Sequence, residues 1–205
     1  MITPRGSEVQ GRIVRAATAL FARQGFRGTS TREIARLADV SEVTIFRYFE
    51  HKDDIFWCAL ESSFSAIQPR LNALSRSAHL ESPEVMLPEI ISVLVDIATF
   101  SPELVRLIAV ALLELRGRAE QTCRENLTPL FAAITNYLSR NIENGKLRNL
   151  DPAIVTAAIA LTVIAQPEIS KLIEGDRLTP RGSREAISAY SSFWLDVLVP
   201  ASVSP

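Results

Sequence analysis

The stretch TREIARLADVSEVTIFRYFEHKDDI, residues 31–55, limits the possible folds of this chain more than any other part of it. Ser30 stands three residues before Glu33, which is the spacing of a capping box at a helix start. After a turn at Asp39, Ser41 can serve as a second N-cap, because its side-chain oxygen can accept hydrogen bonds from free backbone N–H groups. The stretch therefore predicts two short helices joined by a tight turn, with a third helix beginning directly after them.

The apolar residues of this stretch fall on one side of each predicted helix. We expect the first helix to bury Ile34, Ala35 and Ala38, and the second to bury Ile45 and Phe49, which are four residues apart. A small residue such as Ala35 suits the crossing of two short helices, because a larger side chain would hold their backbones apart. This pattern is typical of a helix-turn-helix, whose second helix can enter the major groove of DNA.

The residues of this stretch also form a longer pattern. It comprises Thr29 and Thr31, Arg32-Glu33-Ile34-Ala35, Ala38, Val40-Ser41, Thr44-Ile45-Phe46, Tyr48-Phe49, Lys52 and Ile55. The pattern resembles the DNA-binding segment of TetR-family transcriptional regulators, which reads approximately T-x-R-E-I-A, A-G-V-S, T-[LI]-[YF]-x-[YH]-F and x-K-x-x-[LI]. The motif resemblance covers about the first sixty residues, and beyond them the chain matches only in its helical layout.

Three positions depart from the family pattern. Asp39 replaces the turn glycine, and aspartate can still adopt a left-handed backbone conformation at modest cost. Val43 replaces a frequent glycine of the recognition helix and adds an apolar side chain there. Phe46 stands where the family often has tyrosine, so the ring is kept but a hydroxyl that could reach a phosphate is lost.

The charge distribution suggests two domains. Residues 1–52 hold nine Arg and Lys and five Asp and Glu, a net charge of +4, whereas residues 53–205 hold thirteen and eighteen, a net charge of −5. A basic end and an acidic body are consistent with a DNA-binding segment attached to a larger domain. We therefore expect a homeodomain-like helix-turn-helix domain over 1–52 and an effector-binding and dimerisation domain over 53–205.

Every other segment also reads as helical. Beyond the two short helices we expect helices over 7–24, from 52 to about 74, and over 84–100, 102–115, 118–144, 153–165 and 184–199. Gly25 should end the first of these, Pro69 should kink the fourth helix or end it early, and Pro88 can stand at the start of the fifth. The fold class predicted is all-α, with about nine helices in two bundles.

The helix over 153–165 contains no charged residue, and a helix that is apolar all round is expected to be buried all round. A chain of this size could hardly cover it alone, so a second copy of the chain is the expected cover, as the TetR resemblance also implies. A central helix within a monomer is the alternative. The predicted dimer interface, drawn from this helix and the last one, is Ala157, Ala158, Leu161, Ile187, Tyr190, Trp194 and Val197.

The candidate DNA contacts divide by chemistry. Thr31, Arg47, Tyr48 and Lys52 can bind phosphates, because they offer a helix N-terminus, cations or a hydroxyl. Arg32, Glu42, Val43 and Thr44 can read base edges, and Ser41 and Phe46 complete the predicted DNA-binding surface. Each of these residues can equally be a solvated helix surface. In a symmetric dimer two recognition helices would lie about 34–36 Å apart, which predicts a pseudo-palindromic operator.

The TetR resemblance also implies a small-molecule effector bound between helices of the C-terminal domain. The faces over 90–112 and 127–138 are almost wholly apolar, which favours an apolar or aromatic effector. Each candidate ligand-binding residue can equally be plain core. The candidates are Leu94, Phe100, Glu114, Phe131, Thr135, Asn136 and Tyr137.

Other functional classes find little support in the sequence. It shows no nucleophile elbow, no Gly-rich phosphate loop and no metal-ligand spacing, so we expect no enzymatic activity, no cofactor and no metal. Cys58 and Cys123 read as buried thiols of a cytoplasmic protein, and the longest uncharged run, residues 152–167, is shorter than the ~20 residues that span a bilayer. The sequence thus predicts a DNA-binding regulator, with repression as the commoner mode of the family and activation left open. A helical ligand carrier or scaffold with a non-functional DNA head is the alternative.

Overall fold

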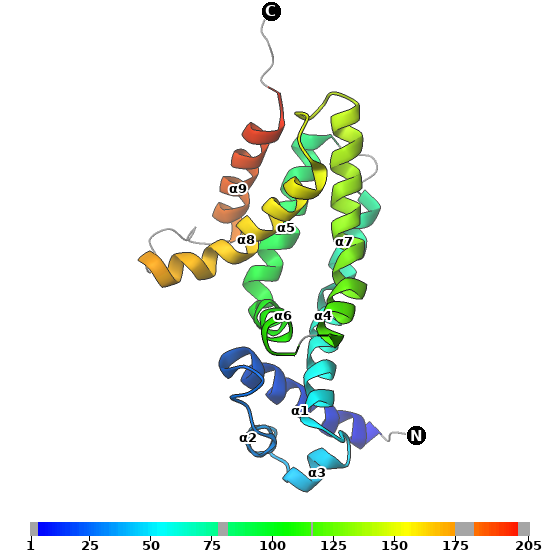
Figure 1. The fold of residues 1–205 in the computed structure, drawn as a ribbon, viewed down its shortest axis with the longest axis vertical. Helices are drawn as coiled ribbons and strands as arrows, with labels where there is room; N and C mark the ends of the chain where they lie inside the picture. The colour runs from blue at the N-terminus through cyan, green and yellow to red at the C-terminus, as the bar shows by residue number, and fades with distance from the viewer. Residues whose placement is uncertain (1–3, 78–81, 116, 175–182, 201–205) are drawn as a thin grey trace, which may run out of the picture. The chain divides into compact units, whose positions relative to one another are not determined.

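The protein is all-α, as predicted (Figure 1). The computed structural model describes residues 4–77, 82–115, 117–174 and 183–200. Within these ranges the chain forms nine helices and no strand. They are α1 (Pro4–Gln24), α2 (Thr31–Leu37), α3 (Glu42–Phe46), α4 (Lys52–Ser77), α5 (Pro83–Phe100), α6 (Pro102–Glu114), α7 (Arg118–Glu143), α8 (Pro152–Glu174) and α9 (Ser183–Leu198).

Helix α1 begins at Pro4, three residues earlier than predicted, and ends at the expected place. Gly25 has a φ of 78°, a left-handed conformation that glycine adopts without a steric penalty. The chain then folds back, so that the Phe26 ring lies 5.7 Å from the rings of both Phe21 and Phe56. These aromatic contacts anchor Phe26 against the end of α1 and the start of α4. Residues 1–3, which precede the helix predicted over 7–24, lie outside the described part of the chain.

Helix α4 runs through Pro69 to Ser77, so the prediction that this proline could end the helix early is wrong. A proline removes one backbone donor and crowds one carbonyl, and Pro69 stands on the exposed side of α4, where water can reach that carbonyl. One face of α4 is buried along its whole length, and its residues are Phe56, Leu60, Phe64, Ile67, Leu71 and Leu74. The burial of this whole face outweighs the local cost of the proline.

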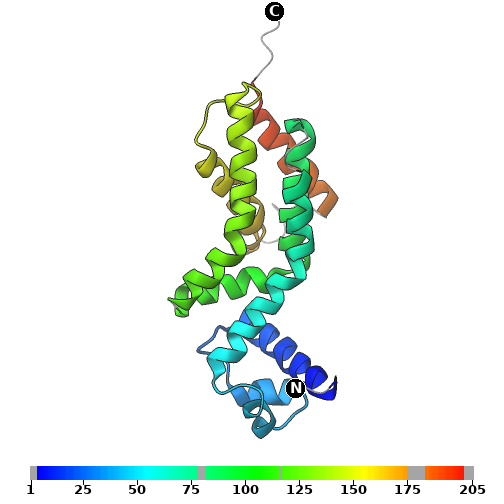
Figure 2. The ribbon, with the colours of Figure 1, turned by 90° about the vertical axis from the view of Figure 1, so that its right-hand side faces the viewer.

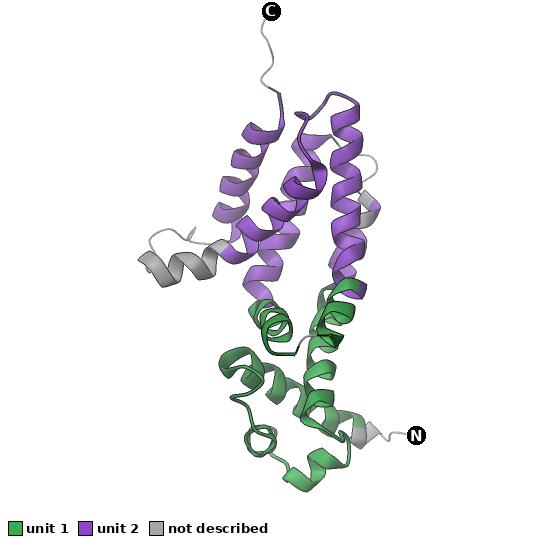
Figure 3. Cartoon of the chain, in the orientation of Figure 1, with its two compact units in different colours: residues 1–67, 102–124 green, residues 68–101, 125–205 purple. Residues whose placement is uncertain are grey.

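The chain divides into two compact units (Figure 3). Unit 1 contains residues 1–67 and 102–124, and unit 2 contains residues 68–101 and 125–205. The division falls inside α4 and α7 rather than at residue 52, and it assigns α6 to unit 1, where α6 packs against α1. A charge count along the sequence cannot register this packing, because α6 is separated from α1 by more than seventy residues.

Unit 2 is built around α5, which packs against both α8 and α9; Figure 2 gives a second view of these helices. Pro83, not Pro88, stands at the start of α5, and Pro88 lies inside it. The buried residues of α5 include Met86, Leu87, Ile90, Ile91 and Leu94. Residues 78–81, between the predicted helix that ends near 74 and the one that begins at 84, lie outside the described ranges. No helix in those ranges has both the length and the apolar composition needed to cross a membrane.

Candidate nucleic-acid interface

Helix α2 starts with the predicted capping box. The Ser30 hydroxyl oxygen accepts the Glu33 backbone N–H at 3.2 Å, and the Glu33 carboxylate accepts the Ser30 backbone N–H at 2.9 Å. The hydrogen bonds that the carboxylate accepts from the Ser30 backbone and then from its hydroxyl lower the pKa of Glu33. Ile34 and Ala35 of α2 are buried, as expected. The first helix of the motif is therefore fixed at its N-terminus by local hydrogen bonds and along one side by packing.

The turn between α2 and α3 is made by Asp39, whose φ is 54°. The prediction that aspartate would take the left-handed conformation of the family glycine is confirmed. The Arg12 guanidinium lies 3.8 Å from the Asp39 carboxylate, and the Val40 N–H donates to the Ala35 carbonyl at 3.0 Å. The turn is thus held by its backbone and by one exposed ion pair from α1.

Helix α3 has the predicted cap and the predicted inner side. The Thr44 backbone N–H donates to the Ser41 hydroxyl at 3.1 Å, while Ile45 is fully buried and Phe49 is 7% exposed. On the outer side, 73% of Val43 and 52% of Phe46 are exposed. A single turn of helix thus presents two large apolar side chains to solvent, although nothing about its own stability requires them there.

Several of the predicted contact residues are bonded to each other. The Thr31 hydroxyl donates to the Glu42 carboxylate at 2.6 Å, which joins the start of α2 to the start of α3. The hydroxyls of Ser41 and Thr44 lie 2.8 Å apart and share a hydrogen bond. The first bond ties α2 to α3, the second lies within the cap of α3, and Arg32 and Arg47 are exposed.

Lys52 at the start of α4 is oriented towards the α1–α2 loop, residues 25–29. Its ammonium donates to the carbonyls of Phe26 at 2.9 Å and Thr29 at 3.0 Å, and it lies 4.2 Å from the centre of the Phe26 ring. A lysine ammonium has three N–H groups, so two are used inside the protein. Tyr48, the other predicted phosphate ligand near α4, is half-buried.

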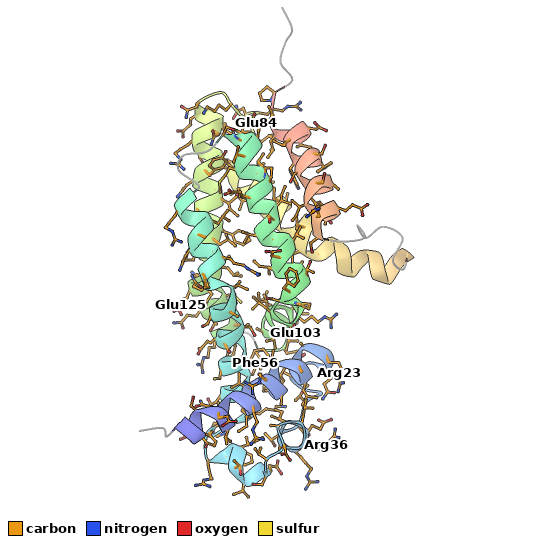
Figure 4. All side chains as sticks on the ribbon, turned by 180° about the vertical axis from the view of Figure 1, so that it is seen from behind. Arg23, Arg36, Phe56, Glu84, Glu103 and Glu125 are labelled. Atoms are coloured by element: carbon orange, nitrogen blue, oxygen red, sulfur yellow. The ribbon has the colours of Figure 1, made fainter. Side chains whose placement is uncertain are left out.

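Exposed arginines surround this surface in unit 1. Arg23, Arg27, Arg32, Arg36 and Arg47 are all exposed, and Figure 4 shows the side chains of Arg23 and Arg36 extending outward from their helices. Guanidinium groups bind phosphate oxygens in a bidentate manner and keep their charge at any physiological pH. The surface formed by α2 and α3 is therefore suited to a polyanion.

The residues predicted to bind an effector are not gathered into one site. Leu94 and Tyr137 are buried in unit 2, Phe131 is half-buried, and Phe100 and Asn136 are exposed. The Thr135 hydroxyl shares a hydrogen bond of 2.9 Å with the Thr156 hydroxyl, which joins α7 to α8. Glu114 belongs to unit 1, where its carboxylate accepts hydrogen bonds from the α1–α2 loop.

The predicted dimer residues are distributed over both sides of α8 and α9. Leu161 is 67% exposed, and Ala157, Ala158, Ile187, Tyr190 and Val197 are half-buried, but Trp194 is only 7% exposed within its own chain. The neighbouring Phe193 is 53% exposed, and Ile154, at the start of α8, is 69% exposed. The sequence analysis did not include these two residues among the predicted interface residues, and that interface stays a prediction. Aromatic residues stand side by side at 193 and 194, so helical spacing alone cannot tell which one faces the core.

Both cysteines carry free thiols, and burial raises the pKa of each. For Cys58 the nearby Glu61 carboxylate adds to this effect. Within the described ranges, no three His, Cys, Asp or Glu side chains come together as they would in a metal site.

The family comparison matches the same part of the chain. Residues 13–57 match the model of the bacterial regulatory proteins of the tetR family. The chain is 28% identical over 141 residues to the HTH-type transcriptional repressor NicS of Pseudomonas putida, an alignment that covers 67% of this chain and 63% of that relative. The chain thus spans less than two thirds of the length of this relative.

Solved structures match the fold over nearly the whole chain. A bacterial regulatory protein of the tetR family from Rhodococcus RHA1 has a TM-score of 0.78 at 18% identity, covering 95% of this chain and 98% of its own. The structure of AibR in complex with isovaleryl coenzyme A and operator DNA has a TM-score of 0.71 at 14% identity, covering 90% and 97%. Residues 13–57 therefore form the helix-turn-helix segment of the tetR family, and the all-α fold of the described residues matches that of solved tetR regulators.

Proposed function

We propose that the protein is a transcriptional regulator, most simply a repressor, that binds a pseudo-palindromic operator as a homodimer and is released by a small apolar effector. The observation that carries this proposal is the outer side of α3. Its apolar side chains, Val43 and Phe46, are 73% and 52% exposed, yet the helix beneath them is held by the Ser41 cap and by Ile45. A rigid, exposed helix among arginines is what major-groove recognition requires.

The proposed role of each side chain follows from the hydrogen bonds that it makes within the protein. Arg32 and Arg47 bind phosphates or guanine edges, and Val43 and Phe46 contact thymine methyl groups. Thr31, Glu42, Ser41 and Thr44 orient the helices through their mutual hydrogen bonds and offer their remaining lone pairs and hydroxyls to DNA. Tyr48 and the third N–H of Lys52 complete the phosphate contacts. Such binding weakens as salt concentration rises, because cations are released from DNA.

The proposed dimer is formed by α8 and α9. Ile154, Leu161 and Phe193 expose large apolar side chains on helices whose described outer positions are otherwise mostly small residues. Covering them with a second copy removes this area from water at about 25 cal/mol per Å². A two-fold arrangement would present two copies of α3 to successive turns of one DNA face.

The proposed effector binds in unit 2. This proposal is supported by the AibR structure, which contains isovaleryl coenzyme A together with operator DNA. In the present chain the interior of unit 2 is mainly apolar. The hydroxyls of Thr135, Thr156 and Tyr137 are the polar groups proposed to orient a ligand there. We assign the protein no enzymatic role and place it in the cytoplasm, where operator DNA is accessible.

Selection of bound sequences from random DNA tests the DNA-binding and dimer proposals together. We expect enrichment of an inverted repeat whose half-sites lie about one helical turn apart. The enriched DNA should bind with a Kd that rises steeply between low and physiological salt. Failure to enrich any sequence, with a folded protein confirmed by circular dichroism, would instead favour a ligand carrier with a non-functional DNA head.

A further inference from the structure

The α1–α2 loop is held by two oppositely charged side chains from distant parts of unit 1. On one side, the Glu114 carboxylate at the end of α6 accepts the backbone N–H of Phe26 at 3.3 Å and that of Arg27 at 2.9 Å. On the other, Lys52 donates to the carbonyls of Phe26 and Thr29. Two charged groups thus bind four backbone groups of one short loop, and hydrogen bonds to charged groups are stronger than neutral ones.

The loop is shaped for the Glu114 side chain. A Cβ added to Gly25 would lie 2.6 Å from a Glu114 carboxylate oxygen, a distance that real Cβ atoms do not show. The φ of 78° at Gly25 independently disfavours any other residue there. The carboxylate therefore occupies the space that the missing side chain leaves, while α6 packs along α1.

What the loop positions is the beginning of α2. It leads directly into Ser30, the N-cap of α2, and Thr31, whose hydroxyl is bonded to Glu42 of α3. Any change in the path of residues 25–29 therefore changes the direction in which α2 and, through this bond, α3 are presented. Glu114 lies on α6 and is not part of the exposed surface of α2 and α3 that would contact DNA.

We propose that Glu114 is a positioning residue for DNA recognition: its carboxylate fixes the α1–α2 loop so that α2 and α3 are presented in the orientation that binds operator. This inference rests on the proposed function. If losing the carboxylate reduces the population of the productive orientation to about one tenth, the apparent Kd for operator rises about tenfold, because apparent affinity scales with that population.

The direction of the effect separates positioning from electrostatics. Neutralising a carboxylate brings less negative charge towards a polyanion, so charge alone predicts tighter binding for Glu114→Gln. Positioning predicts weaker binding, since a glutamine offers one oxygen where the loop presents two N–H groups, and its NH₂ group would face a donor. A weaker complex cannot therefore be attributed to the change in charge.

The matched control is Glu103→Gln, in the first turn of the same helix and about 16 Å along its axis from Glu114 (Figure 4). Both variants and the wild type are measured in the full-length chain, by NMR hydrogen exchange of the Phe26 and Arg27 amides and by fluorescence anisotropy with selected operator DNA. We expect Glu114→Gln to accelerate exchange at both amides at least tenfold and to raise the operator Kd about tenfold. Glu103→Gln should leave the exchange rates unchanged and the Kd unchanged or slightly lower.

Gly25→Ala changes the same loop in a second way, because its Cβ meets the carboxylate and its left-handed φ strains the backbone. It should raise the operator Kd as well, and the combined effect with Glu114→Gln should be less than additive, because the two changes share the loop contact. Unchanged amide exchange in Glu114→Gln would show that the Glu114 carboxylate does not hold the α1–α2 loop. Accelerated exchange with wild-type or tighter operator binding would overturn the positioning role. A wild-type protein that binds no DNA would instead refute the proposed function, and the exchange rates would still report on the contact.

Discussion

The α2–α3 segment and the α8–α9 pair both expose large apolar side chains, but the surroundings of those side chains differ. Val43 and Phe46 lie on a segment with exposed Arg32, Arg36 and Arg47, whereas Ile154 and Leu161 lie on the part of α8, residues 152–165, that contains no charged residue. An apolar group within a cationic surface suits DNA, which offers methyl groups between phosphates. An apolar group on a largely uncharged surface suits another apolar surface. The neighbours of an exposed side chain therefore indicate its partner better than its own hydrophobicity does.

The two regions also differ in what fixes their helices. Residues 30–49 are held by side chain to backbone caps and short polar bonds between residues close in sequence. The α8–α9 pair packs against α5, with Ile159, Val163 and Trp194 buried. Substitutions that disrupt one region at a time therefore test whether DNA binding and dimer formation are independent.

The largest effect is expected from Ile45→Ala. Ile45 of α3 is fully buried. Shortening a buried isoleucine to alanine lowers the free energy of unfolding by about 2–5 kcal/mol. We expect lower urea and thermal midpoints and loss of operator binding, while sedimentation still shows a dimer. A monomeric Ile45→Ala variant would show that the two regions are not independent.

The next largest effect is expected from Leu161→Asp on α8, a position that is 67% exposed in the single chain. A carboxylate buried at the proposed interface has no partner, so the dimer Kd should rise at least a hundredfold, and operator affinity should fall with it. Light scattering after size exclusion measures the change. Leu113→Asp, at a leucine that is 78% exposed on α6, is the matched control and should remain dimeric. Equal behaviour of the two variants would argue against this interface.

A smaller effect is expected from Arg47→Ala. Losing one phosphate contact should weaken binding to all sequences alike and reduce the slope of log K against log salt by about one. Val43→Ala is the comparison, because it should alter the preference at one base pair and leave the salt slope unchanged. If the Arg47→Ala variant instead lost affinity only for particular base pairs, Arg47 would be a base contact in the groove and not a phosphate contact.

The smallest effect is expected from Ser30→Ala, which removes an N-cap and should cost about 1 kcal/mol of stability. The pKa of Glu33 should move up towards its ordinary value of 4.5 without reaching it, because the Ser30 backbone N–H, the larger cause of the lowering, remains. A lowered pKa stabilises the fold above the ordinary value, and this contribution is lost as pH falls through the lowered one. An NMR pH titration of the Glu33 carboxyl checks the shift, and Ser30→Thr should preserve it.

The sequence was most informative where short-range chemistry decides the structure. The Ser30–Glu33 spacing predicted the capping box, and the family pattern predicted the left-handed Asp39. Both depend on atoms within a few residues of each other. The capped starts and the apolar sides of α2 and α3 were predictable for the same reason.

Features that depend on distant residues were not predictable. Glu114 was a candidate ligand-binding residue because few polar groups accompany the apolar faces, and its hydrogen bonds to the backbone of residues 26 and 27 were not foreseen. Lys52 has two of its three N–H groups bonded to loop carbonyls. Neither contact leaves a periodic signal, since the partners are backbone atoms that every residue possesses. The inward turn of Trp194 likewise depends on how α9 meets α5.

The hydrogen bond between Thr31 and Glu42 has a consequence for the proposed DNA recognition. The Thr31 hydroxyl binds one oxygen of Glu42, so the second oxygen and the remaining lone pairs stay available, held in a fixed direction, for a base donor such as cytosine N4. A base with no donor at that place would leave the carboxylate desolvated and unmatched, which costs more than a hydrogen bond contributes. At this position the protein would select its operator partly by rejecting unsuitable bases.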